Sequence, residues 1–185
     1  MLPTIVLFGL AAGLIVAAPM CIMLTVAGDN PVATSPFTGY LLMLLALSLI
    51  FVGVKRYRDQ TLGGVIRFAP ALLVGLGIST VAGIMYVIGW EITLAATDFA
   101  FIDAYANGSI EAARARGASG ADLARVTAEM EKFRTEYANP LVRLPMTFVE
   151  IFPVGVLISL ISAGLLRNSR FLASRAVAGA GARAQ

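Results

Sequence analysis

Hydrophobic residues fill four long stretches of the sequence, which polar segments separate. The stretches contain one charged residue, Glu150, and cover residues 2–27, 38–54, 68–90 and 144–166. A bilayer hydrocarbon core about 30 Å thick is crossed by roughly twenty apolar residues in an α-helix, which also pairs its own backbone polar groups. The pattern therefore predicts an all-α protein, an integral membrane four-helix bundle. We place its helices at about 2–27, 38–54, 66–92 and 141–166.

The segment between the third and fourth helices, residues 93–139, is polar and carries two apolar rows. The rows are Phe99, Ile102 and Tyr105, and then Leu123, Val126, Met130, Phe133 and Tyr137. A period of three to four residues indicates amphipathic helices. Ser119 and Asp122 suit a short-chain capping box, and Asn107 and Gly108 are expected to end one helix before another begins at Ser109. We expect an extracytoplasmic helical hairpin whose rows pack on each other, although a membrane surface or a partner protein would also suit them.

Basic residues gather at the opposite end of the predicted bundle. Lys55, Arg56 and Arg58 form a basic loop after the second helix, and Arg67 opens the third. Basic residues accumulate on the cytoplasmic side of membrane proteins, so this loop is expected to be cytoplasmic and to contact anionic headgroups. With four spans, both termini are then cytoplasmic and the connection 28–37 lies outside. We assign residues 1–170 to a single transmembrane domain and 171–185 to a flexible cytoplasmic tail.

Composition narrows the chemistry that the chain carries. The residues are 58% hydrophobic and 14% charged, and the formal net charge of +3 is small, so nucleic-acid binding is not expected. The sequence has no histidine, which removes the common zinc sites and histidine acid–base catalysis. Glu91 and Asp98 share a helical face, which we interpret as a solvated acidic face rather than a cation site. We expect no cofactor, no metal and no enzymatic activity.

Small residues recur every four positions in three of the predicted helices. The rows are Ala71, Gly75, Ser79 and Gly83; Gly155, Ser159 and Ala163; and Gly9, Gly13 and Ala17. Helices in lipid approach closely where small side chains align, because the hydrophobic effect contributes little between them. These rows are expected to mark the contacts inside the bundle, and association of the chain with itself is the alternative.

Glu150 is the acidic residue that the pattern places inside the bilayer. It lies about 9 Å along the fourth helix from Leu144, where an ionised carboxylate costs on the order of 3 kcal/mol. We expect it to turn inward and to pair with Arg143, two turns earlier, or with a hydroxyl; Arg143 and Arg67 otherwise snorkel to the headgroups. Pro153 removes a backbone donor beside it and kinks the helix. Such an acid either fastens the bundle or titrates in a transport pathway.

Aromatic residues lie near the expected outer ends of two helices. They are Tyr40 in the second helix and Tyr86 and Trp90 in the third. Tyrosine and tryptophan are enriched at membrane interfaces, so we interpret the three as an anchoring belt.

Several motifs together resemble one family of bacterial membrane proteins. They are residues 51–59 (FVGVKRYRD), 63–68 (GGVIRF), 150–155 (EIFPVG), 110–117 (IEAARARG) and 137–140 (YANP). In these segments the chain resembles the domain of unknown function 4199. The resemblance implies a four-helix protein of the bacterial inner membrane and carries no activity.

Taken together, these patterns favour a protein that binds rather than catalyses. We expect a binding, assembly or regulatory component of the cell envelope, with membrane lipids, another envelope protein or a second copy as partners. The alternative is a small oligomeric transporter or channel, coupled to protons or ions through Glu150.

Overall fold

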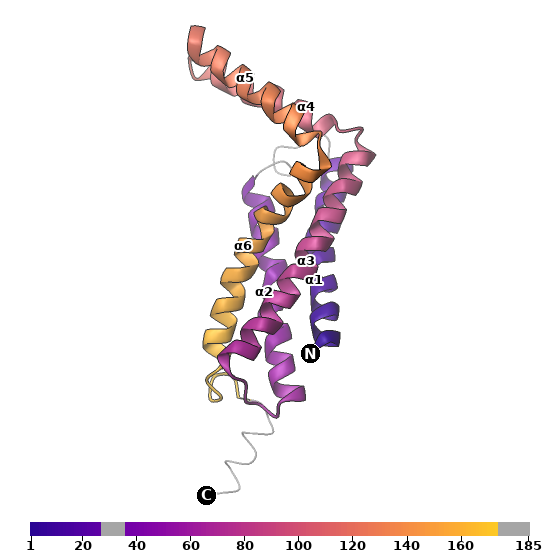
Figure 1. The fold of residues 1–185 in the computed structure, drawn as a ribbon, viewed down its shortest axis with the longest axis vertical. Coiled ribbons are helices and arrows are strands. Elements are labelled where there is room, and N and C mark those ends of the chain that lie inside the picture. The colour runs from indigo at the N-terminus through magenta and orange to yellow at the C-terminus, as the bar shows by residue number, and fades with distance from the viewer. Residues whose placement is uncertain (27–35, 174–185) are drawn as a thin grey trace, which may run out of the picture.

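The computed structural model describes residues 1–26 and 36–173, and every regular element in that part is an α-helix (Figure 1). The helices are α1 (Leu2–Val26), α2 (Pro36–Thr61), α3 (Phe68–Ala96), α4 (Ala100–Ala115), α5 (Gly120–Tyr137) and α6 (Pro140–Leu166). Four of them, α1, α2, α3 and α6, are long and apolar enough to cross a membrane. The predicted all-helical membrane protein with four spans is confirmed. The predicted connection 28–37 falls mostly, and the tail beyond residue 173 wholly, outside the described residues.

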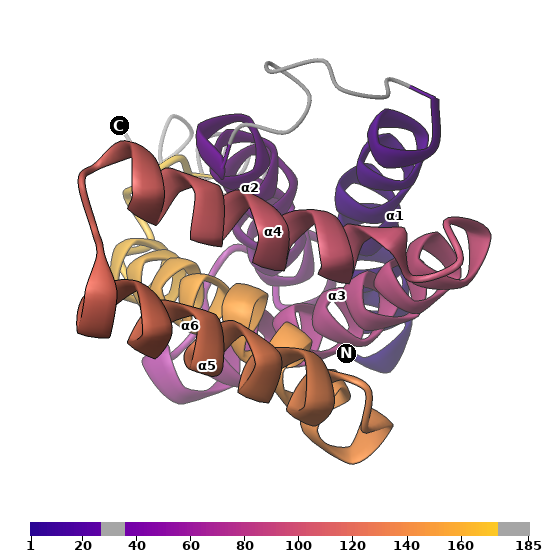
Figure 2. The ribbon, with the colours of Figure 1, turned by 90° about the horizontal axis from the view of Figure 1, so that it is seen from above.

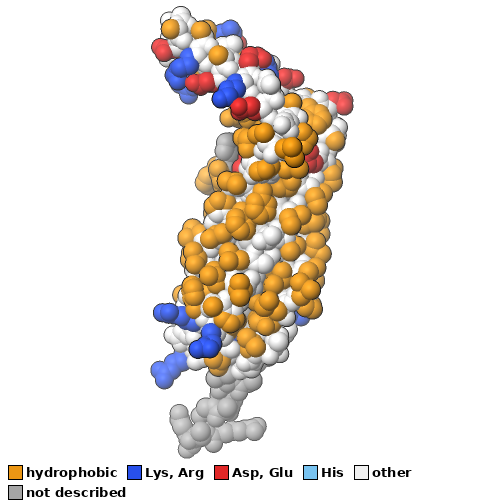
Figure 3. All heavy atoms as spheres, in the orientation of Figure 1, with side chains coloured by type: hydrophobic (Ala, Val, Ile, Leu, Met, Phe, Trp, Pro, Cys, Tyr) orange, Lys and Arg blue, Asp and Glu red, His pale blue; other side chains and the backbone are white. Residues whose placement is uncertain are grey.

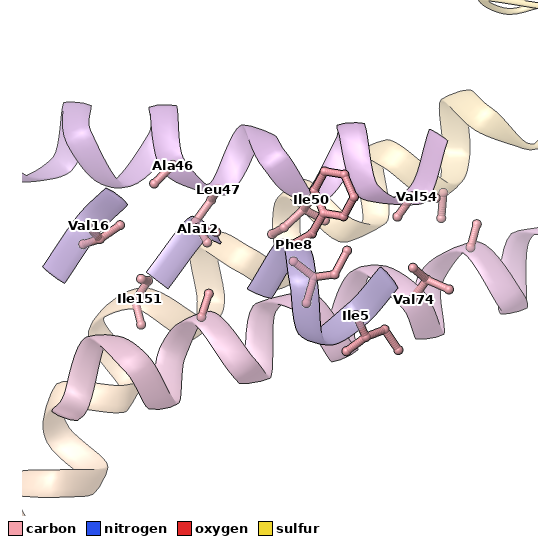
Figure 4. Close-up of a cluster of buried hydrophobic side chains, with 14 of the residues drawn as sticks. Ile5, Phe8, Ala12, Val16, Ala46, Leu47, Ile50, Val54, Val74 and Ile151 are labelled. Carbon is pink, nitrogen blue, oxygen red and sulfur yellow. The ribbon is translucent and has the colours of Figure 1, made fainter. Parts of the chain in front are cut away.

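The four long helices form one bundle with a continuous apolar core. α3 packs along α1 and α6, and α2 closes the other side against both. Side chains from all four helices converge in the core shown in Figure 4, where Ala12, Leu47, Ile50 and Val74 are fully buried or nearly so. On the face that Figure 3 shows, the surface of the bundle is apolar, with basic side chains at one end and the charged hairpin at the other. This distribution is typical of a protein whose bundle lies in lipid.

Small residues make the closest helix contacts, as their spacing predicts. A Cβ atom added to Gly75 would lie 2.8 Å from the Cβ of Ser159, and one added to Gly155 would lie 2.8 Å from the Cβ of Ser79. The Ser79 and Ser159 hydroxyls are 3.1 Å apart between these two contacts. On the other side of α3, Gly9 and Gly13 of α1 receive Val81 and Met85. Gly83 also lies in a contact, where it makes room for the ring of Phe148.

Two helices continue past the points where the sequence pattern ends them. α2 runs on through Lys55 and Arg58 to Thr61, so the predicted basic loop is wrong: Lys55 pairs with Asp59 one turn later, and the chain turns only at Gly63 and Gly64. α4 passes through Asn107 and Gly108 without a break. Glycine costs about 1 kcal/mol in a helix, which the tertiary packing of a helix readily overrides; Ala106, two residues before Gly108, is fully buried in that packing.

α4 and α5 pair as a helical hairpin at one end of the bundle, and its extracytoplasmic placement stays a prediction. Seen from above, the two helices run antiparallel across the bundle end and reach beyond it on the side of α6 and α2 (Figure 2). The apolar rows of the two helices face each other, so the expected packing of one row on the other is confirmed. Ser119 stands at the start of α5, but its side chain makes no capping hydrogen bond, so the predicted capping box is not formed.

Candidate functional site

Two short connections join the hairpin to the bundle: a tight turn between α3 and α4, and the link between α5 and α6. α3 ends at Ala96, and Asp98 and Phe99 both adopt positive φ angles, 48° and 60°, which turn the chain sharply into α4. Asn139 then caps α6 by accepting a hydrogen bond from the Leu141 amide at 3.0 Å. Positive φ is uncommon in residues other than glycine, and two in succession persist only where neighbouring contacts hold them. Here the Phe99 amide donates to the Leu94 carbonyl at 2.9 Å, and the Phe99 ring lies against the guanidinium of Arg143.

Arg143 binds three parts of the chain at the base of the hairpin. Its Nε and Nη2 donate to the two carboxylate oxygens of Glu91, each at 2.7 Å, and its Nη1 donates to the carbonyl of Tyr137 at 2.9 Å. The guanidinium also lies near the rings of Phe99 and Tyr137, with centroid distances of 5.3 and 5.9 Å. We call these residues, Glu91, Phe99, Tyr137 and Arg143, the junction. A bidentate, charge-assisted pair of this kind fixes both position and orientation.

The junction overturns two expectations about charged residues. Arg143 is 4% exposed, so it neither snorkels to the headgroups nor pairs with Glu150. Glu91 does not join Asp98 in a solvated acidic face, because it is the partner of Arg143 and Asp98 lies in the turn. Glu91 and Arg143 are 52 positions apart, and no local spacing links them.

Aromatic side chains extend the junction into the hairpin. The Trp90 indole donates to the Tyr137 hydroxyl at 2.7 Å. From Trp90 the rings follow one another through Phe101, Tyr105 and Phe133 back to Tyr137, with centroid distances of 4.9, 6.2, 5.5 and 5.0 Å. Burial raises the pKa of the Tyr137 hydroxyl above its ordinary value, so it stays neutral at physiological pH. A hollow of about 370 Å³ near this row is lined by Phe99, Ile102, Asp103, Arg134 and Ala138.

Trp90 and Tyr86 do not belong to an anchoring belt. Each is 8% exposed and uses its polar atom inside the protein, Trp90 toward Tyr137 and Tyr86 toward Glu150. The interpretation as membrane anchors is therefore wrong for these two residues. Tyr40 is exposed, and its role as a membrane anchor stays a prediction.

Glu150 has a hydroxyl as its partner, which is one of the two partners expected. The Tyr86 hydroxyl donates to Glu150 Oε2 at 3.2 Å. The side chain of Glu150 is nevertheless exposed on α6 and does not turn inward as predicted. The reason lies in the helix face: Arg143, Thr147 and Ile151 occupy the buried side, and Glu150 projects at its flank. Pro153 lies inside α6 next to it, as expected.

At the basic end of the bundle, the predicted role of Arg58 in contacting headgroups is wrong. Arg58 is fully buried, and its guanidinium donates to the carbonyls of Phe171 and Leu172 at 2.9 and 2.7 Å and to Asp59 at 2.7 Å. It therefore binds the segment after α6 and does not reach headgroups, and Phe171 and Leu172 are held by the bundle. Arg56 and Arg67 are exposed, and their contact with headgroups stays a prediction.

The comparisons with known proteins identify one family. The chain has no match among curated proteins and none among solved structures. One family model covers residues 7–168, which include the whole hairpin and nearly all of the four spans, and its description is Protein of unknown function (DUF4199). The resemblance expected from the motifs is thereby confirmed, and the chain belongs to the DUF4199 family.

Proposed function

We propose that this membrane protein acts by binding another protein of the cell envelope, which docks on the outer hairpin. The observation that carries the proposal is the contrast between the base of the hairpin and the rest of it. At the base, Arg143 fixes α5 to α3 and α6. Beyond the base, α4 packs chiefly on α5, and the pair projects away from the bundle (Figure 1). A rigidly mounted, outward element suits recognition, because little conformational entropy is lost when it binds.

The surface of the hairpin suits a protein better than a lipid surface. Its large exposed apolar side chains in the described structure are Phe99 and Tyr105, both in the half nearest α3. A helix that lies in a membrane interface carries an apolar face with basic residues on the other side. Here acidic and basic side chains alternate instead, in ion pairs such as Glu111 with Arg114 and Arg125 with Glu129. Mixed charges of this kind fit a polar protein surface of complementary pattern.

The orientation and the absence of catalysis are parts of the same proposal. Exposed arginines at the end opposite the hairpin support a cytoplasmic placement of that end, with the hairpin on the outer side of a bacterial inner membrane (Figure 3). The buried hydroxyls of Ser79, Thr147 and Ser159 each donate to a carbonyl one turn earlier in their own helix. Hydroxyls engaged in this way serve packing, which supports a binding role over an enzymatic one.

Site-specific photocrosslinking tests the proposed docking surface. A photoreactive amino acid is placed at Ala124 or Ala128, which are exposed on α5, in the full-length protein expressed in its own host. We expect the same protein partner to be captured from both positions. A matched probe at Leu7, exposed in the apolar belt on α1, is expected to capture lipid and not that partner. Capture of the same proteins from all three positions, or of no protein from α5, would contradict the proposal.

The alternative of an oligomeric transporter has a narrower basis. It rests on Glu150, whose carboxylate lies within the apolar span and is exposed. The hollow described above lies at the base of the hairpin, between α4 and α5, rather than around this carboxylate. If Glu150 carries protons, Glu150→Gln is expected to abolish proton flux into proteoliposomes that the unaltered protein supports. Equal flux through both proteins, or none through either, removes the transporter alternative.

A further inference from the structure

The outer half of α6 presents hydrogen-bond acceptors on a face that is otherwise apolar. Met146, Glu150, Pro153 and Leu157 are all exposed, and their spacing of four, three and four residues places them on one side of the helix. We call these four residues the α6 stripe. Glu150 is 17 residues from Arg167 at the basic end, a rise of about 25 Å in a helix. A hydrocarbon core about 30 Å thick therefore contains it, in the outer half.

Two acceptors at this stripe lack a donor within the described residues. The Tyr86 hydroxyl occupies Glu150 Oε2, and no bond to Oε1 is formed in that part of the chain. Pro153 has no N–H, so the carbonyl of Val149, four residues earlier, receives no helical hydrogen bond. Val149 is 62% exposed, and its carbonyl is one residue away from Glu150. In hydrocarbon, where water supplies no donor, acceptors left open in this way favour contact with a group that donates.

The described chain offers no cation for this position. Arg143 is the basic residue nearest to Glu150 along α6, and its donors are engaged by Glu91 and by the Tyr137 carbonyl. The next arginine on that side, Arg134, is bound to Asp103 and Asn107 in the hairpin. The remaining basic residues of the bundle lie at its other end and include Lys55, Arg67 and Arg167.

A second copy of the chain is a poor complement to the α6 stripe. Copies inserted with the same orientation present the same depth to each other, so a symmetric contact would bring Glu150 against Glu150. Like charges at close range repel.

We propose that the α6 stripe receives a transmembrane helix of a different protein, one that carries a lysine or arginine near its outer boundary. The basic side chain donates to Glu150 and to the open carbonyl of Val149, and apolar side chains above and below it pack on Met146 and Leu157. The proposal uses a surface separate from α4 and α5. It shares with the function proposed above only the orientation of the bundle, so failure of hairpin docking would leave it standing.

Association with a synthetic helix tests the chemistry of this contact directly. The full-length protein, labelled at its C-terminus, is reconstituted in vesicles with a leucine–alanine transmembrane peptide that carries one lysine six residues from its outer end. A matched peptide has leucine in place of the lysine. Energy transfer is expected to show association about tenfold tighter for the lysine peptide, which is the scale of one polar contact between helices in lipid. Glu150→Gln is expected to reduce it to the level of the leucine peptide.

Two further variants keep the result interpretable. Leu157→Trp leaves the acid in place but obstructs the stripe, and is expected to weaken binding of the lysine peptide. Leu7→Trp, on the exposed face of α1, is the control and is expected to leave it unchanged. Equal association of the two peptides, or no effect of Glu150→Gln, would overturn the proposal. Energy transfer between two copies of the protein, if Glu150→Gln abolished it, would also overturn the proposal, because the occupant of the stripe would then be a second copy.

Discussion

Arg143→Gln is expected to lower the free energy of unfolding by about 3 kcal/mol, because it leaves the carboxylate of Glu91 without its partner in a partly buried place. It also removes the donor to the Tyr137 carbonyl, so the base of the hairpin loosens. Trp90 is the only tryptophan in the chain and lies beside the junction, so its fluorescence reports this region directly. Unfolding by sodium dodecyl sulfate in mixed micelles, followed by Trp90 emission, measures the change.

Two controls separate the junction from a general loss of charge. Arg125→Gln removes an arginine from an exposed pair on α5 and is expected to change the unfolding free energy by about 0.5 kcal/mol or less. The double variant Arg143→Gln with Glu91→Gln is expected to be less destabilised than the sum of the two single variants, because it leaves no unpaired charge. An unfolding curve for Arg143→Gln that matches the unaltered protein would show that the junction contributes no stability.

Gly155→Ala is expected to destabilise the bundle by about 1–3 kcal/mol, the usual cost of overpacking a tight contact. The added methyl group would lie 2.8 Å from both the Cβ and the Oγ of Ser79, so α3 and α6 must move apart. Gly164 is the matched control, since it lies in the same helix and has nothing within 4 Å of an added Cβ. Gly164→Ala is expected to be neutral or slightly stabilising, because alanine favours a helix. If the two substitutions changed the unfolding free energy equally in the same assay, the α3–α6 contact would accommodate an added methyl group without cost.

The sequence was sufficient to predict what the bilayer and close packing impose. The hydrocarbon core sets a minimum length for a span, so four apolar stretches predict four helices. Helices in lipid need small residues where they touch, so the rows through Gly75 and Gly155 locate the α3–α6 contact. The apolar period of residues 123–137 likewise predicts a helix that packs on its neighbour.

The candidate site depended on contacts that no local pattern encodes. Arg143 and Glu91 meet only because the hairpin returns the chain to the end of α3. Arg58 is separated from the Phe171 and Leu172 carbonyls by more than a hundred positions, and backbone acceptors leave no trace in a sequence. For Glu150, the rule that charges in lipid turn inward predicts the wrong side. A general preference does not specify which flank of α6 the neighbouring helices cover.

The position of Arg143 has a mechanical consequence for the whole molecule. One guanidinium joins the membrane helix α6, the end of α3 and the last turn of α5, so the three segments share a pivot. α5 has 18 residues and is an arm about 27 Å long at 1.5 Å per residue. A tilt of α6 by roughly 10° would therefore swing the far end of the arm by about 5 Å, the rise of one helical turn. A change in the tilt of α6 within the lipid would thus displace the far end of the hairpin outside the lipid.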